Sequence, residues 1–268
     1  MNRTFERLWV GLWYVVYVAV RVVLRLLIGK EKRNRAIMIS NFHFTRFHSV
    51  KYGSILPSYE YVVSRVVKKA MKKGGTFIDV GANRGYFTLM AYQIIRNRAQ
   101  GQIVAVEADP VVFSELKKNL PQDNRIIAVN KAVYTVDDQP ITFYVGGGER
   151  VAGSVHPTEI HFKHHLTGET VTVMAIRLDT LIKRLRIEEV NLIKMDIEGA
   201  EYPVLIDATL DISNVKNMVI EVHYPYASWE SIKIMRSLVE RGFMATPLYP
   251  DANVWRWYFL AYKGETPW

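Results

Sequence analysis

The stretch TFIDVGANRGYFT, residues 76–88, predicts a strand, a glycine turn and the start of a helix. Its apolar β-type run ends in Asp79, glycines stand at Gly81 and Gly85, and an apolar helical pattern begins at Tyr86. Such a turn presents backbone N–H groups and a helix N-terminus to a ligand, and the missing side chains let that ligand approach closely. The sequence therefore predicts a ligand-binding loop between a strand and a helix.

The spacing of the two glycines separates two classes of cofactor. A dinucleotide site follows G-x-G-x-x-G, in which the middle glycine admits the pyrophosphate. Here Ala82, Asn83 and an arginine separate Gly81 from Gly85, and Asp79 adds a negative charge nearby. A cationic ligand with a free amino group suits this loop better than a pyrophosphate does. S-adenosylmethionine is such a ligand, and we expect it as the cofactor.

A second apolar run supports a nucleoside cofactor. Residues 102–106 read as a buried strand that ends at Glu107. A doubly wound sheet places a carboxylate about 20 residues past the glycine loop, where it accepts hydrogen bonds from ribose hydroxyls. Glu107 is therefore the expected ribose ligand.

Strands and helices alternate through most of the chain. Helices are expected at 59–73, 86–97, 110–119, 178–185 and 229–240, and strands at 102–107, 125–129, 190–195 and 218–222. Right-handed crossovers turn this order into a parallel sheet with its ligand at the carboxyl ends of the strands. The predicted fold class is α/β, a Rossmann-like, mostly parallel doubly wound sheet with a closing antiparallel strand pair near the C-terminus.

The N-terminal segment 1–35 is apolar and basic. As a helix, residues 8–29 would reach roughly 33 Å, enough to cross a bilayer core. Its two arginines, Arg21 and Arg25, fall with Arg7 on one narrow stripe. A helix lying in the membrane interface, a membrane span, and a helix packed on the protein's own core or in an oligomer all remain open. We expect a cytoplasmic domain over 36–268, associated with a membrane through residues 8–29 if that helix spans or anchors.

Charge and composition exclude or disfavour several kinds of partner and catalytic group. Residues 1–35 hold eight basic and two acidic side chains, so they carry +6 of the net charge of +9 and leave +3 for the remainder. This distribution disfavours a nucleic-acid partner. The chain has no cysteine, which excludes disulfides, thiolate metal sites and a cysteine nucleophile.

Residues 140–177 break the alternation and predict a hairpin-like insertion on the substrate side of the cofactor. Four histidines lie in this segment: His156, His161, His164 and His165. Their spacing matches no recognised set of metal ligands, so we expect solvated or substrate-facing side chains and no metal site.

The stretch VNLIKMDIEGAE, residues 190–201, predicts a second strand end followed by a glycine turn and a helix. Asp196 is expected at the carboxyl end of the central strand, facing the reacting methyl group. Glu198 and Glu201 fall in or near the first helical turn, where acids stabilise the helix dipole, and capping is the expected role of Glu201. The run 218–222 leads to His223 at the edge of the same cleft.

Together these motifs resemble the FkbM family of S-adenosylmethionine-dependent methyltransferases. They are DVGANRG at 79–85, Glu107, NKA at 130–132, GS at 153–154, LDTL at 178–181, IKMDIEGAE at 193–201 and EVH at 221–223. The resemblance covers about residues 60–262 and implies a class I methyltransferase fold. The expected cofactor-binding residues are Asp79, Gly81, Ala82, Asn83, Gly85, Tyr86, Glu107, Asn130, Ala132 and Asp196.

The resemblance also implies O-methylation of a hydroxyl on a sugar, lipid-linked or small-molecule acceptor. The candidate catalytic residues are Asp196, which would position the acceptor, with Glu198 and His223; His223 is a candidate base because imidazole titrates near neutral pH. Two alternatives remain open, a nucleic-acid methyltransferase and a non-catalytic, membrane-tethered protein that binds S-adenosylmethionine. The sequence leaves the oligomeric state open.

Overall fold

The computed structural model describes residues 59–98, 100–150, 152–158, 166–225, 228–250 and 257–267. The expected N-terminal helix, the domain boundary at residue 35 and the histidines at 161, 164 and 165 lie outside these residues. In the part of the chain that is described, no helix is long and apolar enough to cross a membrane.

The main sheet has the strand order β3-β2-β1-β7-β8-β10-β9. Its strands are β1 (Thr76–Val80), β2 (Gln102–Val106), β3 (Ile126–Val129), β7 (Leu192–Met195), β8 (Asn217–Val222), β9 (Met244–Pro250) and β10 (Trp257–Tyr262). Strands β1, β2, β3, β7 and β8 pair in parallel, whereas β10 runs antiparallel to β8 and to β9. The predicted fold class is confirmed, with β7 at the centre of the sheet.

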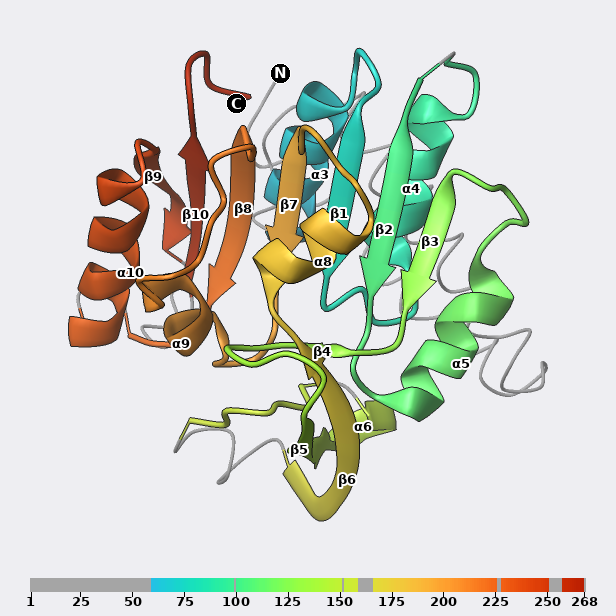
Figure 1. The fold of residues 1–268 in the computed structure, drawn as a ribbon, viewed down its shortest axis with the longest axis vertical. Helices are drawn as coiled ribbons and strands as arrows, with labels where there is room; N and C mark the ends of the chain where they lie inside the picture. The colour runs from blue at the N-terminus through green and yellow to red at the C-terminus, as the bar shows by residue number, and fades with distance from the viewer. Residues whose placement is uncertain are drawn as a thin grey trace, which may run out of the picture. The chain divides into compact units, whose positions relative to one another are not determined.

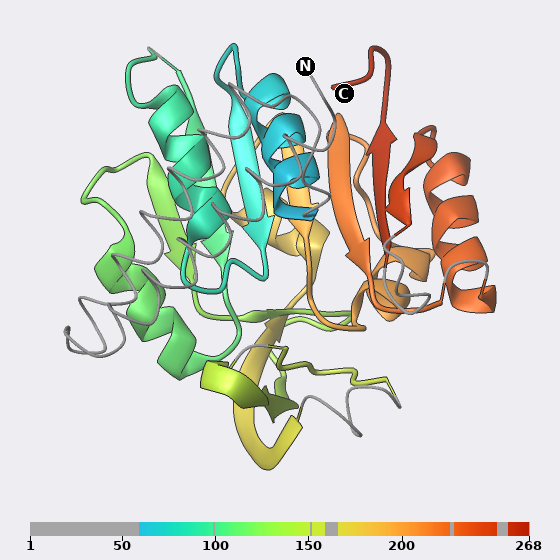
Figure 2. The ribbon, with the colours of Figure 1, turned by 180° about the vertical axis from the view of Figure 1, so that it is seen from behind.

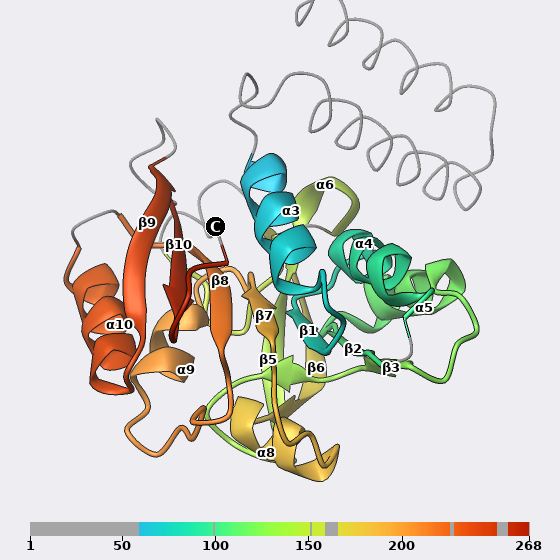
Figure 3. The ribbon, with the colours of Figure 1, turned by 90° about the horizontal axis from the view of Figure 1, so that it is seen from above.

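Helices cover both faces of this sheet. They are α3 (Tyr59–Ala70), α4 (Tyr86–Ile95), α5 (Pro110–Asn119), α8 (Leu178–Arg184), α9 (Glu201–Ile206) and α10 (Trp229–Glu240). Helices α3 and α4 lie on one face and α8 on the other (Figure 3). Ile78 and Ile193 therefore pack with Leu181 of α8, while Asp79 and Lys194, the next residue along each strand, point to the α4 side.

Most helices and strands lie within a few residues of their predicted bounds. The helices 110–119 and 229–240 are confirmed to the residue, because proline at the first turn of α5 and the Ser228 hydroxyl before α10 mark their starts. Helix α9 begins at Glu201, so Glu198 lies in the preceding turn, where its φ is +55°.

A small second sheet contains β4 (Ala132–Val133), β5 (Pro140–Gly146) and β6 (Leu166–Ile176), and α6 (Gly147–Arg150) follows β5. Strands β5 and β6 pair antiparallel, which confirms the hairpin-like character of this segment. Figures 1 and 2 show it beyond the edge of the main sheet at which β2, β3, β7 and β8 end. The carbonyl oxygen of His156 lies so close to Gly199 that a Cβ there would be 2.6 Å from it. The insertion therefore packs against the loop after β7.

Candidate active site

The loop after β1 passes very close to the end of β7. Gly81 has a φ of +75°, and a Cβ built on it would lie 1.8 Å from the carbonyl oxygen of Asp196. The N–H groups of Gly81 and Ala82 both donate to the carbonyl of Val106, at 3.0 and 2.9 Å. This glycine therefore joins the carboxyl ends of β1, β2 and β7 into one compact edge.

Replacing Gly81 with alanine is expected to weaken binding of S-adenosylhomocysteine at least about tenfold, because the new Cβ must push the loop away from Asp196. Calorimetric titration measures this change. Gly242→Ala is the matched control, since Gly242 has a φ of +81° but no atom within 4 Å of the Cβ position. Equal affinity in the Gly81→Ala variant and the wild type would refute the close approach.

A buried lysine links the ends of β1 and β7. The parallel register pairs Asp79 with Lys194, and Lys194 Nζ lies 3.7 Å from Asp79 Oδ1 and 3.3 Å from Asp196 Oδ2. The same ammonium group donates to the carbonyl of Gly81 at 2.9 Å. Burial alone would lower the pKa of Lys194, but Asp196, Asp79 and Glu221 outweigh it and raise that pKa. Lys194 is therefore a charged group inside the protein.

Asp79 lies fully buried beneath the loop. Its Oδ2 accepts a hydrogen bond from the Thr88 hydroxyl at 2.7 Å, which fixes the start of α4 against β1. Burial raises the pKa of Asp79, while Lys194 and Thr88 lower it in part. The Asp79 carboxylate therefore stabilises the loop through Thr88 and Lys194. Its direct contact with a cofactor stays a prediction.

Glu107 holds the loop from the β2 side. Its Oε2 accepts from the N–H of Asn83 at 2.8 Å and its Oε1 from the N–H of Asp109 at 3.0 Å. Asn130 donates through its side-chain amide to the carbonyl of Glu107 at 2.8 Å and so ties the end of β3 to the end of β2. Burial raises the pKa of Glu107 to about 7, against the lowering effect of its two backbone donors.

This pKa predicts a pH-dependent affinity for the cofactor. If the ionised Glu107 accepts the ribose hydroxyls, its protonation on going from pH 8 to pH 6 lowers the competent fraction about tenfold. Binding of S-adenosylhomocysteine should weaken by that factor over this range. Glu107→Gln should bind more weakly and lose this pH dependence; a variant that keeps the wild-type slope would contradict the assignment.

His223 lies at the centre of a cluster of carboxylates. Its Nδ1 lies 3.1 Å from Glu201 Oε1, and its Nε2 lies 3.0 Å from Glu198 Oε2 and 3.9 Å from Asp196 Oδ1. Burial opposes a charge on the ring, but Glu198 and Glu201 outweigh it, so the pKa of His223 lies well above its ordinary value. Glu201 is itself fixed, because its oxygens accept from the N–H groups of Ile197 and Gly199, each at 2.9 Å.

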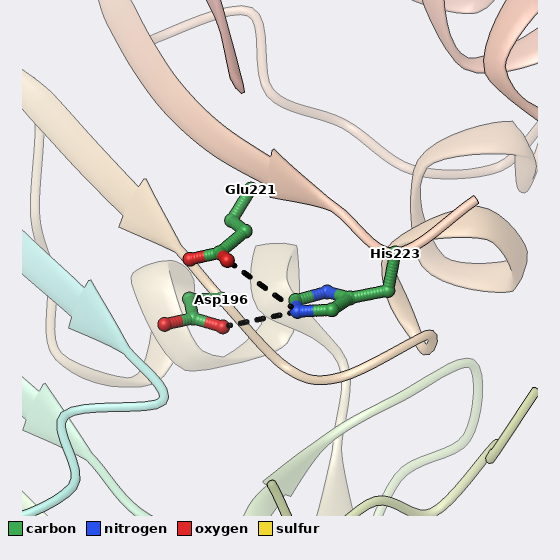
Figure 4. Close-up of side chains that lie close together, drawn as sticks. All are labelled: Asp196, Glu221 and His223. Carbon is green, nitrogen blue, oxygen red and sulfur yellow. Dashed lines mark ion pairs between the residues drawn. The ribbon is translucent and has the colours of Figure 1, made fainter. Parts of the chain in front are cut away.

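Glu221 completes this cluster from inside β8. Its Oε1 lies 3.6 Å from His223 Nε2, and the residue is 5% exposed. Figure 4 shows the Glu221 carboxylate and Asp196 converging on the same side of the imidazole ring. Asp196, Glu221 and His223 each offer one donor atom, and the three atoms lie within 4.8 Å of one another.

The structure brings most of the predicted site residues to one edge of the sheet. Asp196, Glu198 and His223 meet in one cluster, and Glu107 and Asn130 meet at the neighbouring strand ends. Glu201 lies in the first turn of α9, as predicted, but it makes no capping hydrogen bond to that helix; its carboxylate accepts from the preceding turn and pairs with His223, a contact that the sequence did not predict. The roles of all these residues toward a ligand stay predictions.

Lys194 and Glu221 were missed as members of the site. Both interrupt apolar strands, LIKM and NMVIEV, and both are nearly fully buried. A charged residue in the middle of a buried strand is itself a signal, because such a group needs a partner inside the protein.

The fold and this edge of the sheet define a Rossmann-like methyltransferase whose cofactor is S-adenosylmethionine. The narrow loop at Gly81 and the carboxylate of Glu107 fit a nucleoside with a cationic centre. The chain belongs to the FkbM family, because the methyltransferase FkbM domain matches residues 79–244, more than half of the chain.

One relative and two solved structures illustrate what this chain is similar to. Methyltransferase sdnD of Sordaria araneosa is 24% identical over 195 residues, which are 63% of this chain and 73% of that protein. Fibrillarin of Aeropyrum pernix, solved with S-adenosyl-L-methionine, has a TM-score of 0.44 and 14% identity, covering 75% of this chain and 73% of its own. An rRNA methylase from Streptococcus thermophilus has a TM-score of 0.44 and 8% identity, covering 79% and 100%.

Proposed function

We propose that this methyltransferase transfers its methyl group to a hydroxyl oxygen of a sugar, lipid-linked or small-molecule acceptor. The observation that supports the proposal is the carboxylate and imidazole cluster at the ends of β7 and β8, where Glu198 Oε2 lies 3.0 Å from His223 Nε2. O-methylation releases the proton of the acceptor hydroxyl, and a carboxylate next to an imidazole can accept it.

The chain's own residues position the acceptor and take up this proton. S-adenosylmethionine, when bound, supplies a methyl group on an activated sulfonium, so alignment of donor and acceptor accounts for much of the rate. The side chains of Asp196 and Glu198 are each 23% exposed and can contact a ligand at this edge, whereas His223 is 7% exposed. In our proposal Glu198, beside His223, accepts the hydrogen bond of the reacting hydroxyl and then its proton, while Asp196 contacts the acceptor and positions it.

The insertion would select the acceptor. The Tyr134 hydroxyl lies 3.5 Å from His156 Nδ1, and the backbone of His156 packs against Gly199, one residue after Glu198. Tyr224 donates to the carbonyl of Gly199 at 2.9 Å and adds a second phenol to the same edge. Hydroxyl and imidazole groups of this kind suit a polar, hydroxyl-bearing ligand.

A panel of acceptors tests the proposal. The protein would be incubated with methyl-labelled S-adenosylmethionine and, separately, with sugars, polar lipids, hydroxylated small molecules and RNA. We expect label in one hydroxyl class, recovered as an alkali-stable ether and located by mass spectrometry. Label on nitrogen or on RNA would refute it, and cofactor binding without transfer to any acceptor would favour a non-catalytic protein.

A further inference from the structure

The side chains around His223 come from two neighbouring strand ends and converge on one point. Asp196 follows β7, Glu221 lies within β8, and His223 directly follows β8. His223 Nε2 is 3.6 Å from Glu221 Oε1 and 3.9 Å from Asp196 Oδ1. Donor atoms that bind one metal ion at about 2.0–2.2 Å lie roughly 3.0–3.6 Å apart, so small side-chain movements would make these three atoms ligands.

The imidazole ring is held in the orientation that a metal ligand requires. Glu201, which is fully buried, lies 3.1 Å from Nδ1 and favours the tautomer whose proton is on that nitrogen. Two backbone N–H groups hold the Glu201 carboxylate in turn. Nε2 then points toward Glu198, at 3.0 Å, and toward Glu221 and Asp196, so an ion bound to Nε2 would take the place of the Glu198 contact. A carboxylate behind a histidine in this way is the usual support of a metal-binding imidazole.

The two carboxylate oxygens of Asp196 face different partners. Its Oδ2 contacts Lys194 at 3.3 Å, whereas its Oδ1 faces His223 Nε2. Within the described residues, this Oδ1 is buried and has no hydrogen-bond partner. A buried carboxylate oxygen without a hydrogen-bond donor is costly, and a cation at this point would stabilise it.

The formal charges around the ring also favour a cation. The carboxylates that face the imidazole are those of Asp196, Glu198, Glu201 and Glu221. Against these four negative charges stand Lys194 and, when protonated, His223, which leaves an excess of two negative charges among the six side chains. Charge that is buried without compensation destabilises the folded state.

We propose that Asp196, Glu221 and His223 bind a divalent metal ion, with Glu201 as the support of the histidine. Two carboxylates and one imidazole form a donor set that suits ions such as Mn²⁺. The ion would leave coordination positions for the acceptor hydroxyl and lower its pKa as a Lewis acid, while Glu198 accepts the proton. That catalytic role rests on the proposed function, whereas binding of the ion does not. The inference departs from the sequence-based expectation of no metal site.

Titration of the 268-residue chain with Mn²⁺ in the absence of acceptor tests the site, with free Mn²⁺ followed by electron paramagnetic resonance. We expect one ion per chain and at least about tenfold weaker binding in Glu221→Gln. Glu240→Gln is the matched control, because it makes the same charge change in an exposed ion pair with Arg236 on α10 and should bind as the wild type does.

A spectroscopic measurement identifies the ligand directly. Pulsed paramagnetic resonance should detect an imidazole nitrogen coupled to bound Mn²⁺ in the wild type and lose it in His223→Asn, with circular dichroism to confirm that each variant is folded. An unchanged signal of free Mn²⁺ would mean that no ion binds and would overturn the proposal. Equal binding by wild type and Glu221→Gln, or the absence of nitrogen coupling in the wild type, would mean an adventitious ion only and overturn it as well. Because no turnover is measured, these outcomes are independent of the identity of the acceptor.

Discussion

Replacing Lys194 with methionine is expected to lower the free energy of unfolding by about 3–5 kcal/mol. Methionine keeps an unbranched chain but removes the charge, which leaves the buried Asp79 and the end of β7 without their cation. The Lys194 side chain is only 8% exposed, so water cannot take the place of the lost charge in the variant. Chemical denaturation followed by circular dichroism measures the loss, compared with Lys216→Met.

Lys216 is the matched control because its ion pair with Glu189, at 2.6 Å, is about half exposed on both sides. Such surface pairs contribute at most about 1 kcal/mol, so the two lysine variants should differ clearly. The Lys194 variant should also bind S-adenosylhomocysteine more weakly, since the carbonyl of Gly81 loses its donor. Similar losses of stability in both variants would show that Lys194 is not an internal counter-ion.

The loop between β1 and α4 could be predicted from the sequence because its causes are local. A strand that ends in Asp79, two glycines and an apolar helical pattern all fall within residues 76–88, and each constrains the backbone beside it. The structure places this loop where expected. It also explains why residue 81 must be glycine, and no local sequence pattern contains that reason. That reason is the carbonyl of Asp196, which follows β7, more than 100 residues later in the chain.

The cluster around His223 could be predicted only in part. Asp196 and His223 follow strands, so the general rule for parallel sheets places both at the ligand edge. Their distances to Glu201 and Glu221 depend on strand register and on the turn before α9, where Glu198 adopts a φ of +55°. Sequence spacing alone cannot reveal contacts that are set by two strands and a turn together.

The buried charges of the main sheet also could not be predicted from sequence spacing. Lys194 is the third residue of a four-residue buried strand, and its partner Asp79 becomes visible only when β1 and β7 pair in register. The insertion is a further case: its turn residues predict a hairpin, but the contact of His156 with Gly199 depends on how that hairpin folds back. Long-range packing therefore decides which polar residues belong to the site.

Replacing Asp196 with alanine is expected to lower turnover at least about 100-fold while the fold stays intact. The backbone at this position is held independently of the side chain, because the Asp196 N–H donates to the carbonyl of Val80 at 3.1 Å. Lys194 keeps Asp79 as its counter-ion in the variant. Turnover is measured as formation of S-adenosylhomocysteine with the acceptor that the panel identifies.

Asp211→Ala is the control for Asp196→Ala, because it removes an aspartate side chain at the surface. The Asp211 side chain is 54% exposed in the loop before β8, and its Oδ1 accepts hydrogen bonds from Ser213, so turnover should stay at the wild-type level. Binding of S-adenosylhomocysteine by the Asp196 variant separates loss of chemistry from loss of the cofactor site. If binding and turnover both stay near wild type, Asp196 neither positions the acceptor nor completes the cluster, and the reaction must be assigned to other groups at this edge of the sheet.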